Sequence, residues 1–108
     1  MTLAVDDFMA RGAKIRGLAV RKSRFRGHGD ALWHGTHEIA HCHNGQADIR
    51  LTRAAVREMR DELRMDARMD LRRTGTDWIL IRLRVAADVD RALELVRRAL
   101  RADRTIGA

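Results

Sequence analysis

The sequence predicts an α+β fold, in which an antiparallel sheet packs against helices as a two-layer sandwich. Apolar and polar residues alternate after an Asn-Gly pair at 44–45 and again over 77–85, as in strands with one buried face. Two further segments, after Thr52 and after Asp88, repeat apolar residues at helical spacing. The predicted order is ββαββα, with both helices on one face of the sheet. An N-terminal helix and an extended segment are expected to precede it.

The histidine-rich segment 34–50 is predicted to form the central hairpin, because Asn44-Gly45 tolerates the positive φ angles of a type I′ turn. A two-residue turn fixes four opposed pairs, which are His43–Gln46, Cys42–Ala47, His41–Asp48 and Ala40–Ile49. Opposed side chains share a face, so Cys42 is expected to be a small core residue on the apolar face. The other face is expected to carry His37, Ile39, His41, His43, Asp48 and Arg50.

The remaining elements follow from local patterns. Residues 2–9 indicate a short helix that ends near Gly12, and residues 13–21 an extended segment. The N-cap Thr52 and the apolar spacing after it predict one helix of about three turns. The other expected elements are a loop at 27–30 with a solvated His28, a strand at 31–33 with Trp33 at the core edge, a strand at 67–73, a turn at 74–76, a strand at 77–85, a helix from the N-cap Asp88 and a frayed tail from Ala102.

The strand at 77–85 is expected to use both faces. Its aliphatic residues alternate with Trp78, Arg82 and Arg84, which therefore lie opposite the face that the helices cover. This second face suits a ligand, the basic N-terminal arm or a second copy of the chain in a homodimer. The histidine face of the sheet is then open, or covered only by the N-terminal segment, and such a polar face is where we expect a ligand site.

The length of 108 residues suits one domain with a modest core. We expect a basic segment at 1–27 that packs on or flanks a single domain at 28–108. No apolar run approaches the length of a membrane span, and Asp6 and Asp7 interrupt the N-terminal segment, unlike in a signal peptide. The single cysteine cannot form an internal disulfide, so a cytoplasmic location is expected.

The formal net charge of +7 is concentrated near the N-terminus. The segment 11–26 contains no acidic residue, and its basic residues are Arg11, Lys14, Arg16, Arg21, Lys22, Arg24 and Arg26. Such a run can contact phosphates, with an affinity that falls steeply as the salt concentration rises. We expect at most weak, nonspecific nucleic-acid binding, and a solvated basic arm is the simpler interpretation.

A second hypothesis arises from the His-Glu-x-x-His motif at 37–41. On a helix, His37 and His41 would be zinc ligands one turn apart, and Glu38 would polarise a water molecule in a zinc-dependent hydrolase. That helix would be confined to about two turns by Gly35 and Asn44-Gly45, which leaves it marginal. The strand interpretation explains more residues, because it also accounts for the alternation after the turn.

Several short motifs occur in a fixed order, namely His37-Glu38-Ile39-Ala40-His41-Cys42-His43-Asn44, Asp48-Ile49, Val56-Arg57-Glu58-Met59, Asp77-Trp78, and Asp88-Val89 with Ala92-Leu93-Glu94-Leu95. With this set the segment 25–101 resembles the luciferase-like domain family of small bacterial proteins of unknown function. The chain departs from the family pattern at Ala40, Asn44 and Asp77, where the family usually has glycine, and around Arg68 and Met69, where relatives often carry one or two histidines. The resemblance implies a fold and a cytoplasmic setting rather than a reaction, and it supports the strand interpretation of the histidines.

His41 and His43 are the strongest candidates for ligand-binding residues. As an i, i+2 pair they point to one side of a strand, and Asp48 lies opposite His41. Two imidazoles and a carboxylate can hold a divalent metal such as zinc with open positions for a substrate, or bind an anionic small molecule when protonated. The expected ligand site comprises His37, His41, His43, Asp48, Arg50, Trp78, Arg82 and Arg84. The alternative is a surface row of hydrogen-bonded histidines, and the sequence does not establish whether the protein is an enzyme. On an open face, replacing His41 and His43 by alanine is expected to change stability by only about 0.5–1 kcal/mol.

Overall fold

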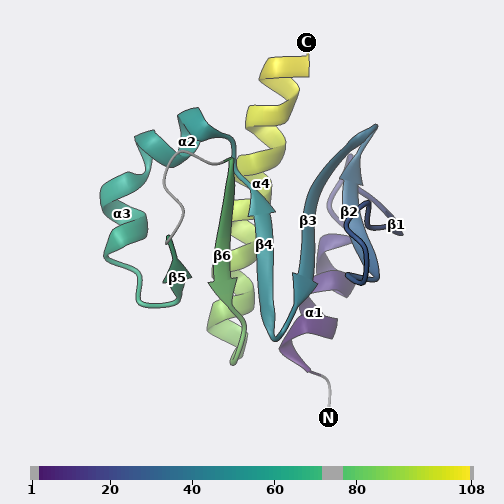
Figure 1. The fold of residues 1–108 in the computed structure, drawn as a ribbon, viewed down its shortest axis with the longest axis horizontal. Helices are drawn as coiled ribbons and strands as arrows, with labels where there is room; N and C mark the ends of the chain where they lie inside the picture. Colours follow the sequence, from purple (N-terminus) through teal and green to yellow (C-terminus); the bar gives the residue numbers. More distant parts are fainter. Residues whose placement is uncertain (1–2, 72–76, 108) are drawn as a thin grey trace.

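The computed structural model describes residues 3–71 and 77–107 as a six-stranded antiparallel sheet with helices packed against it (Figure 1). Its strands lie in the order β1-β2-β3-β4-β6-β5. The elements in chain order are α1 (Ala4–Gly12), β1 (Ala19–Lys22), β2 (Asp30–His34), β3 (His37–His43), β4 (Gln46–Arg50), α2 (Arg53–Glu58), α3 (Arg60–Arg64), β5 (Met69–Asp70), β6 (Trp78–Arg82) and α4 (Ala86–Gly107). The α+β class is therefore confirmed.

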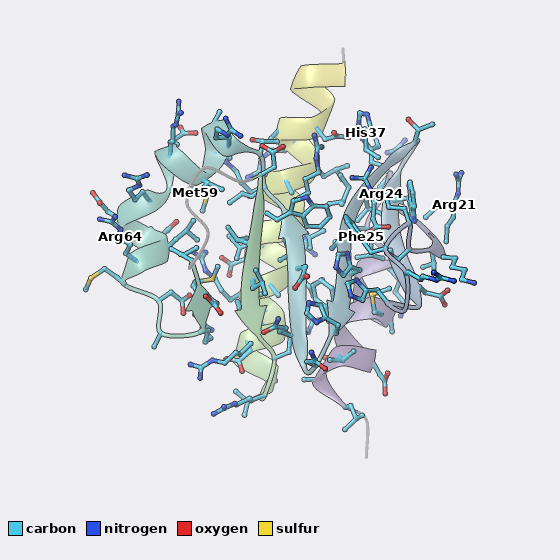
Figure 2. All side chains as sticks on the ribbon, in the orientation of Figure 1. Arg21, Arg24, Phe25, His37, Met59 and Arg64 are labelled. Carbon is cyan, nitrogen blue, oxygen red and sulfur yellow. The ribbon has the colours of Figure 1, made fainter. Side chains whose placement is uncertain are left out.

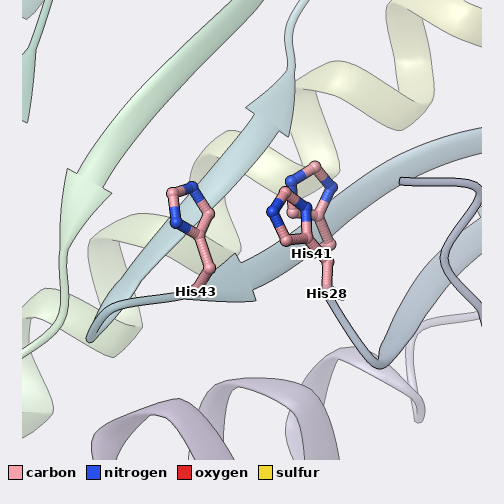
Figure 3. Close-up of side chains that lie close together, drawn as sticks. All are labelled: His28, His41 and His43. Atoms are coloured by element: carbon pink, nitrogen blue, oxygen red, sulfur yellow. The ribbon is translucent and has the colours of Figure 1, made fainter. Parts of the chain in front are cut away.

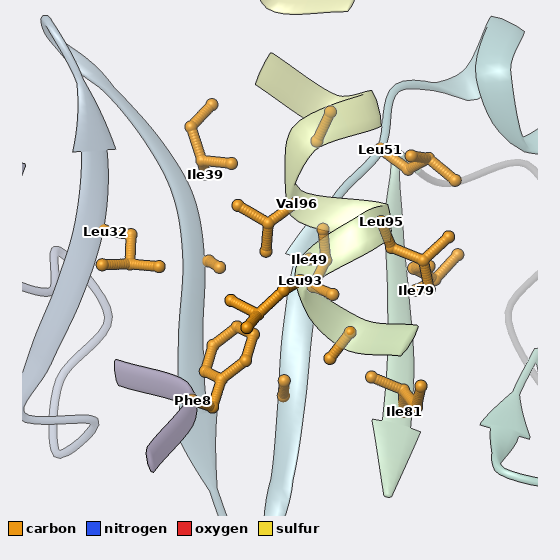
Figure 4. Close-up of a cluster of buried hydrophobic side chains, with 14 of the residues drawn as sticks. Phe8, Leu32, Ile39, Ile49, Leu51, Ile79, Ile81, Leu93, Leu95 and Val96 are labelled. Carbon is orange, nitrogen blue, oxygen red and sulfur yellow. The ribbon is translucent and has the colours of Figure 1, made fainter. Parts of the chain in front are cut away.

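The core lies between the sheet and a layer formed by α1 and α4, which pack against each other. Apolar residues recur along α4 at helical spacing, so one stripe of this helix is buried. Figure 4 shows this stripe meeting the aliphatic residues of β3, β4 and β6, and Phe8 of α1 joins the same cluster. The largest side chains that are fully buried are Phe8, Leu32, Ile39, Ile49, Leu51, Leu63, Ile79, Ile81, Leu93, Leu95, Val89 and Val96.

The central hairpin has the predicted register at all four opposed pairs, from Ala40–Ile49 to His43–Gln46. Asn44 and Gly45 have φ angles of 51° and 72°, as a type I′ turn requires of both residues. Cys42 packs against the core as expected. The hairpin prediction is confirmed.

The face pattern of β3 is nevertheless interrupted by a β-bulge. Leu32 pairs with Ala40 and Trp33 pairs with Glu38, so Ile39 is an extra residue without a partner across the strand pair. An extra residue reverses the alternation of side chains beyond it. Ile39 is consequently buried in the core instead of lying on the histidine face, and Glu38 takes the side of the sheet on which His41 lies. The prediction that His37 and Ile39 share the face of His41 is wrong for this reason.

The predicted ββαββα order is also wrong. The basic N-terminal segment supplies a strand, β1, which pairs with β2 at the sheet edge, so four strands precede the helices at 53–64. The helices that pack together over the sheet are α1 and α4, whereas α2 and α3 lie toward its β6–β5 side. In the described residues, the predicted N-terminal helix that ends near Gly12 is confirmed as α1, and the strand predicted at 31–33 is confirmed as the longer β2.

Several predicted elements differ in length. Thr52 accepts a hydrogen bond from the backbone N–H of Ala55 as an N-cap, but the helix after it is divided into α2 and α3 at Met59. The predicted strand at 67–73 is reduced to β5 in the described residues, and the turn at 74–76 lies outside them. The helix α4 begins before Asp88, which reaches back to accept from the N–H groups of Arg84 and Val85. It also continues to Gly107, so the frayed tail was a wrong prediction.

The basic residues of the segment 11–26 are exposed. Figure 2 shows Arg21 at the outer edge of the molecule, far from Arg64 of α3. Arg11 is paired with Asp7 and Asp90. Phosphate binding by this segment stays a prediction.

Among the described helices, none combines the length and the apolar composition that crossing a membrane would require.

Candidate functional site

Three histidines meet above the polar face of β3 (Figure 3). His41 and His43 come from β3, and His28 comes from the loop between β1 and β2. Each offers one ring nitrogen such that the three nitrogens lie within 4.8 Å of one another. The ring of His28 stacks on both neighbours, with centroids 4.6 Å from His41 and 4.7 Å from His43. This set is hereafter the histidine cluster.

The prediction that His28 is a solvated loop residue is wrong, because its Nδ1 atom is buried. The loop folds back over the sheet, and the backbone N–H of Ser23 donates to the carbonyl of Gly29 at 2.7 Å. Gly27 and Gly29, on either side of His28, have φ angles of 84° and 65°, which glycine adopts without strain. The loop 23–29 therefore covers part of the histidine face and completes the site with His28.

Aromatic rings enclose the cluster on one side. The ring of Phe25, from the same loop, lies 5.0 Å from that of His41 and meets Trp78 of β6 edge-on at 5.6 Å. Trp78 lies 5.3 Å from His41. These rings exclude water from one side of His41, so charges near it are less screened than on an open sheet face.

His41 lies between two carboxylates. Its Nδ1 is 2.8 Å from Oε2 of Glu38, and its Nε2 is 3.0 Å from Oδ2 of Asp48. Burial, the largest influence, lowers the pKa of His41, but hydrogen bonds to and charges of Asp48 and Glu38 together outweigh it. The pKa of His41 is therefore raised above 6.5, and the imidazolium form is favoured.

Asp48 also approaches His43, whose Nε2 lies 2.8 Å from the same Oδ2 atom. Its other oxygen, Oδ1, is buried and has no partner among the described residues. His28 Nδ1 is in the same situation, and Trp33 Nε1 is the third such atom in the described part of the chain. Buried polar atoms are almost always paired, so two orphan atoms beside one cluster require an explanation.

Cys42 takes no part in this face. Burial, followed by the negative charges of Asp48 and Asp6, raises the pKa of its thiol to about 12. A thiol that stays protonated at neutral pH is a poor nucleophile and metal ligand. The side chain is a small core residue, as the sequence predicted.

The structure places two of the expected site residues elsewhere, around Asp103 of α4, which is 2% exposed. His37 Nδ1 lies 2.8 Å from Asp103 Oδ1, and Arg50 Nη1 lies 3.3 Å from the same atom. His34 Nδ1 is 2.5 Å from Oδ2. Burial would raise the pKa of Asp103, but its bonds to His34 and His37 lower that pKa below 3.8. These contacts join the β2–β3 hairpin to α4.

Of the remaining expected residues, only Trp78 reaches the histidine cluster. Arg82 lies on the β5 side, where its Nη2 donates to the carbonyl of Ala67 at 2.6 Å. Arg84 is exposed, and its backbone N–H donates to Asp88. The set brought together is thus His41, His43, Asp48 and Trp78, with the addition of His28, Phe25 and Glu38.

The helical form of the His-Glu-x-x-His hypothesis is wrong, because His37–His43 is the strand β3. His37 contacts Asp103 while His41 contacts Asp48, so the two histidines do not face one ion. A zinc hydrolase of that type is not supported.

Fold and site together define a small α+β domain with a histidine and carboxylate cluster on one sheet face. The model of the Luciferase domain family matches residues 36–99, which extend from the start of β3 far into α4. The chain belongs to this family. The matched region contains His41, His43 and Asp48, whereas His28 and Phe25 precede it. Comparison with curated proteins and with solved structures gave no match.

Proposed function

We propose that the histidine cluster binds a divalent transition-metal ion through His28, His41 and His43, with Asp48 beside it. The observation that supports this most is the pair of orphan atoms, His28 Nδ1 and Asp48 Oδ1, which are buried without a partner among the described residues. A cation would satisfy His28 Nδ1 directly, and water bound to that cation would donate to Asp48 Oδ1. Three imidazoles are ligands that suit zinc, and also iron, copper or nickel.

The spacing of the ring nitrogens is compatible with one ion. Ligands of a tetrahedral zinc at about 2.1 Å are about 3.4 Å apart, so nitrogens within 4.8 Å must approach by at most about 1.4 Å. Small rotations of His28 and His43 supply this movement, because His28 is on a loop and His43 is next to the turn. His41 is held in place by Glu38 and Asp48.

Three protein nitrogens leave a fourth coordination position, which water or a small-molecule ligand would occupy. Phe25 and Trp78 form an apolar wall beside His41 against which such a ligand would pack. The function that fits this arrangement is metal-dependent binding of a small molecule.

Zinc titration of protein purified without an affinity tag, followed by calorimetry, tests the metal site. Replacing His28 or His43 by alanine is expected to weaken zinc binding at least about a hundredfold, because a direct ligand matters more than an outer-shell residue. His37→Ala is the matched control. His37 contacts Asp103 outside the histidine cluster, so this substitution is expected to leave the zinc affinity unchanged. Equal affinity of wild type, His28→Ala and His43→Ala would contradict the proposal.

Zinc binding is also expected to depend on pH. His41 must lose its Nε2 proton to become a ligand, and its pKa is raised by Asp48 and Glu38 against the opposing effect of burial. The titratable groups that face His41 are Glu38 at Nδ1, Asp48 at Nε2, and the rings of His28 and His43. Affinity should fall as pH drops through the raised pKa of His41, with release of protons on binding. Calorimetry in buffers of different ionisation enthalpy measures that release, and binding without proton release near neutral pH would contradict this prediction.

A further inference from the structure

Glu38 makes contacts that no pattern in the sequence assigned to it. Its side chain is 1% exposed, and its carboxylate has three partners. Oε1 accepts from the backbone N–H of Arg24 at 2.8 Å. Oε2 accepts from the hydroxyl of Ser23 at 3.0 Å and lies 2.8 Å from Nδ1 of His41. One buried carboxylate therefore joins the loop that carries His28 to the imidazole of His41.

We propose that Glu38 is the positioning residue of this site, which anchors the loop bearing His28 and holds the Nδ1 proton of His41 so that Nε2 faces the metal position. This inference rests on the proposed metal site. It adds a residue that does not contact the ion itself and acts through His28 and His41.

The anchoring part follows from the hydrogen bonds between the loop and the buried carboxylate. If the loop moved away, Glu38 would lose two of its donors, Ser23 Oγ and the Arg24 N–H. Hydrogen bonds that a charged acceptor receives inside the protein are stronger than those between neutral groups. Glu38 thus favours the closed loop, and the closed loop is the state that brings His28 to His41.

The orienting part follows from a comparison of the two carboxylates of His41. Glu38 is 1% exposed and 2.8 Å from Nδ1, whereas Asp48 is 14% exposed and 3.0 Å from Nε2. Water can replace a hydrogen bond to Asp48 more readily than one to Glu38. The Nδ1–H group of His41 therefore points to Glu38, and Nε2 is the nitrogen on the side of the metal position. Carboxylates that hold the second nitrogen of a ligating histidine are common in metal sites.

Two substitutions separate these roles. Glu38→Gln keeps the size of the side chain and an oxygen that accepts from the Arg24 N–H. Its amide group, however, would donate to Nδ1 of His41, so the imidazole proton would move to Nε2. A protonated Nε2 cannot bind the metal ion. Ser23→Ala removes the hydrogen bond from the Ser23 hydroxyl to Glu38 and leaves the contact between Glu38 and His41 in place. Glu62→Gln is the matched control, because Glu62 is 59% exposed and lies on α3.

The experiment combines zinc calorimetry, hydrogen exchange of residues 23–29 and nitrogen NMR of the His41 ring. Glu38→Gln is expected to lower zinc affinity by about tenfold to a hundredfold. Ser23→Ala is expected to lower it by about twofold to tenfold and to speed exchange in the loop. Glu62→Gln should match wild type. Zinc affinity of Glu38→Gln within twofold of wild type would overturn the inference.

The NMR measurement does not depend on the variants being folded. In wild-type protein under alkaline conditions, His41 is expected to carry its proton on Nδ1, and a proton on Nε2 would overturn the orienting role. If wild type binds no zinc, the proposed function fails, while the Nδ1 proton and the faster loop exchange in Ser23→Ala still support the two roles of Glu38. Unchanged loop exchange in Ser23→Ala would overturn the anchoring role.

Discussion

Replacing His41 by alanine is expected to lower the free energy of unfolding by about 3–5 kcal/mol, the cost of breaking a buried ion pair by removing one partner. His41 is 3% exposed and lies between Glu38 and Asp48. Its removal leaves two carboxylates near each other without the cation that both contact. Urea denaturation at slightly acidic pH, where the imidazolium is present in wild type, measures the loss.

The pH dependence of this contribution has a defined sign. The pKa of His41 is raised in the folded state, so the stability that it contributes is fully present below 6.5 and is lost as pH rises through the folded value. The difference between wild type and His41→Ala should therefore shrink at alkaline pH. A difference that grows with pH would contradict the assignment of a charged His41 in the metal-free protein.

His43→Ala is the matched control, since the His43 side chain is 27% exposed and contacts only one of the two carboxylates of His41, Asp48. It is expected to cost no more than about 1 kcal/mol. In the His41→Ala background, Asp48→Asn should restore part of the stability by removing one of the two charges. Equal effects of His41→Ala and His43→Ala would show that the carboxylates are not held together by His41.

The burial of His41 could not be predicted from the sequence. We therefore expected that replacing His41 and His43 would change the free energy of unfolding only slightly. The alternation around Asn44-Gly45 established the register, because a two-residue turn has one pairing. It did not establish what covers the polar face. That cover is the loop at Ser23–Gly29, whose charged and glycine-rich composition is also typical of a solvated arm.

The bulge at Ile39 was the other feature that simple alternation missed. Adjacent apolar residues, Ile39 and Ala40, interrupt an otherwise polar stretch, and such a break in a strand is a signal for an extra residue. That signal would have placed Glu38 with His41 and moved His37 away. Predicting the contact of His37 with Asp103 would also have required knowing that α4 continues past Ala102. The local sequence pattern gave no evidence for that continuation.

Phe8→Ala is the second substitution with a large expected effect, a loss of about 3–5 kcal/mol in the free energy of unfolding. Phe8 is 0% exposed and belongs to the same core cluster as Leu32 of β2 and Leu93 of α4. Removing its ring leaves a cavity between α1, α4 and the sheet, which the surrounding rigid elements cannot fill.

Leu3→Ala is the matched control, because Leu3 is 65% exposed near the start of α1 and should change stability by less than about 0.5 kcal/mol. The comparison also tests whether the residues before 28 only flank the domain, as the sequence suggested. If they were a loosely attached arm, Phe8→Ala would be as harmless as Leu3→Ala. A large loss that appears in one cooperative transition by both circular dichroism and tryptophan fluorescence would instead show that α1 folds with the sheet. The loop that carries His28 would then begin from a fixed support, as the histidine cluster requires.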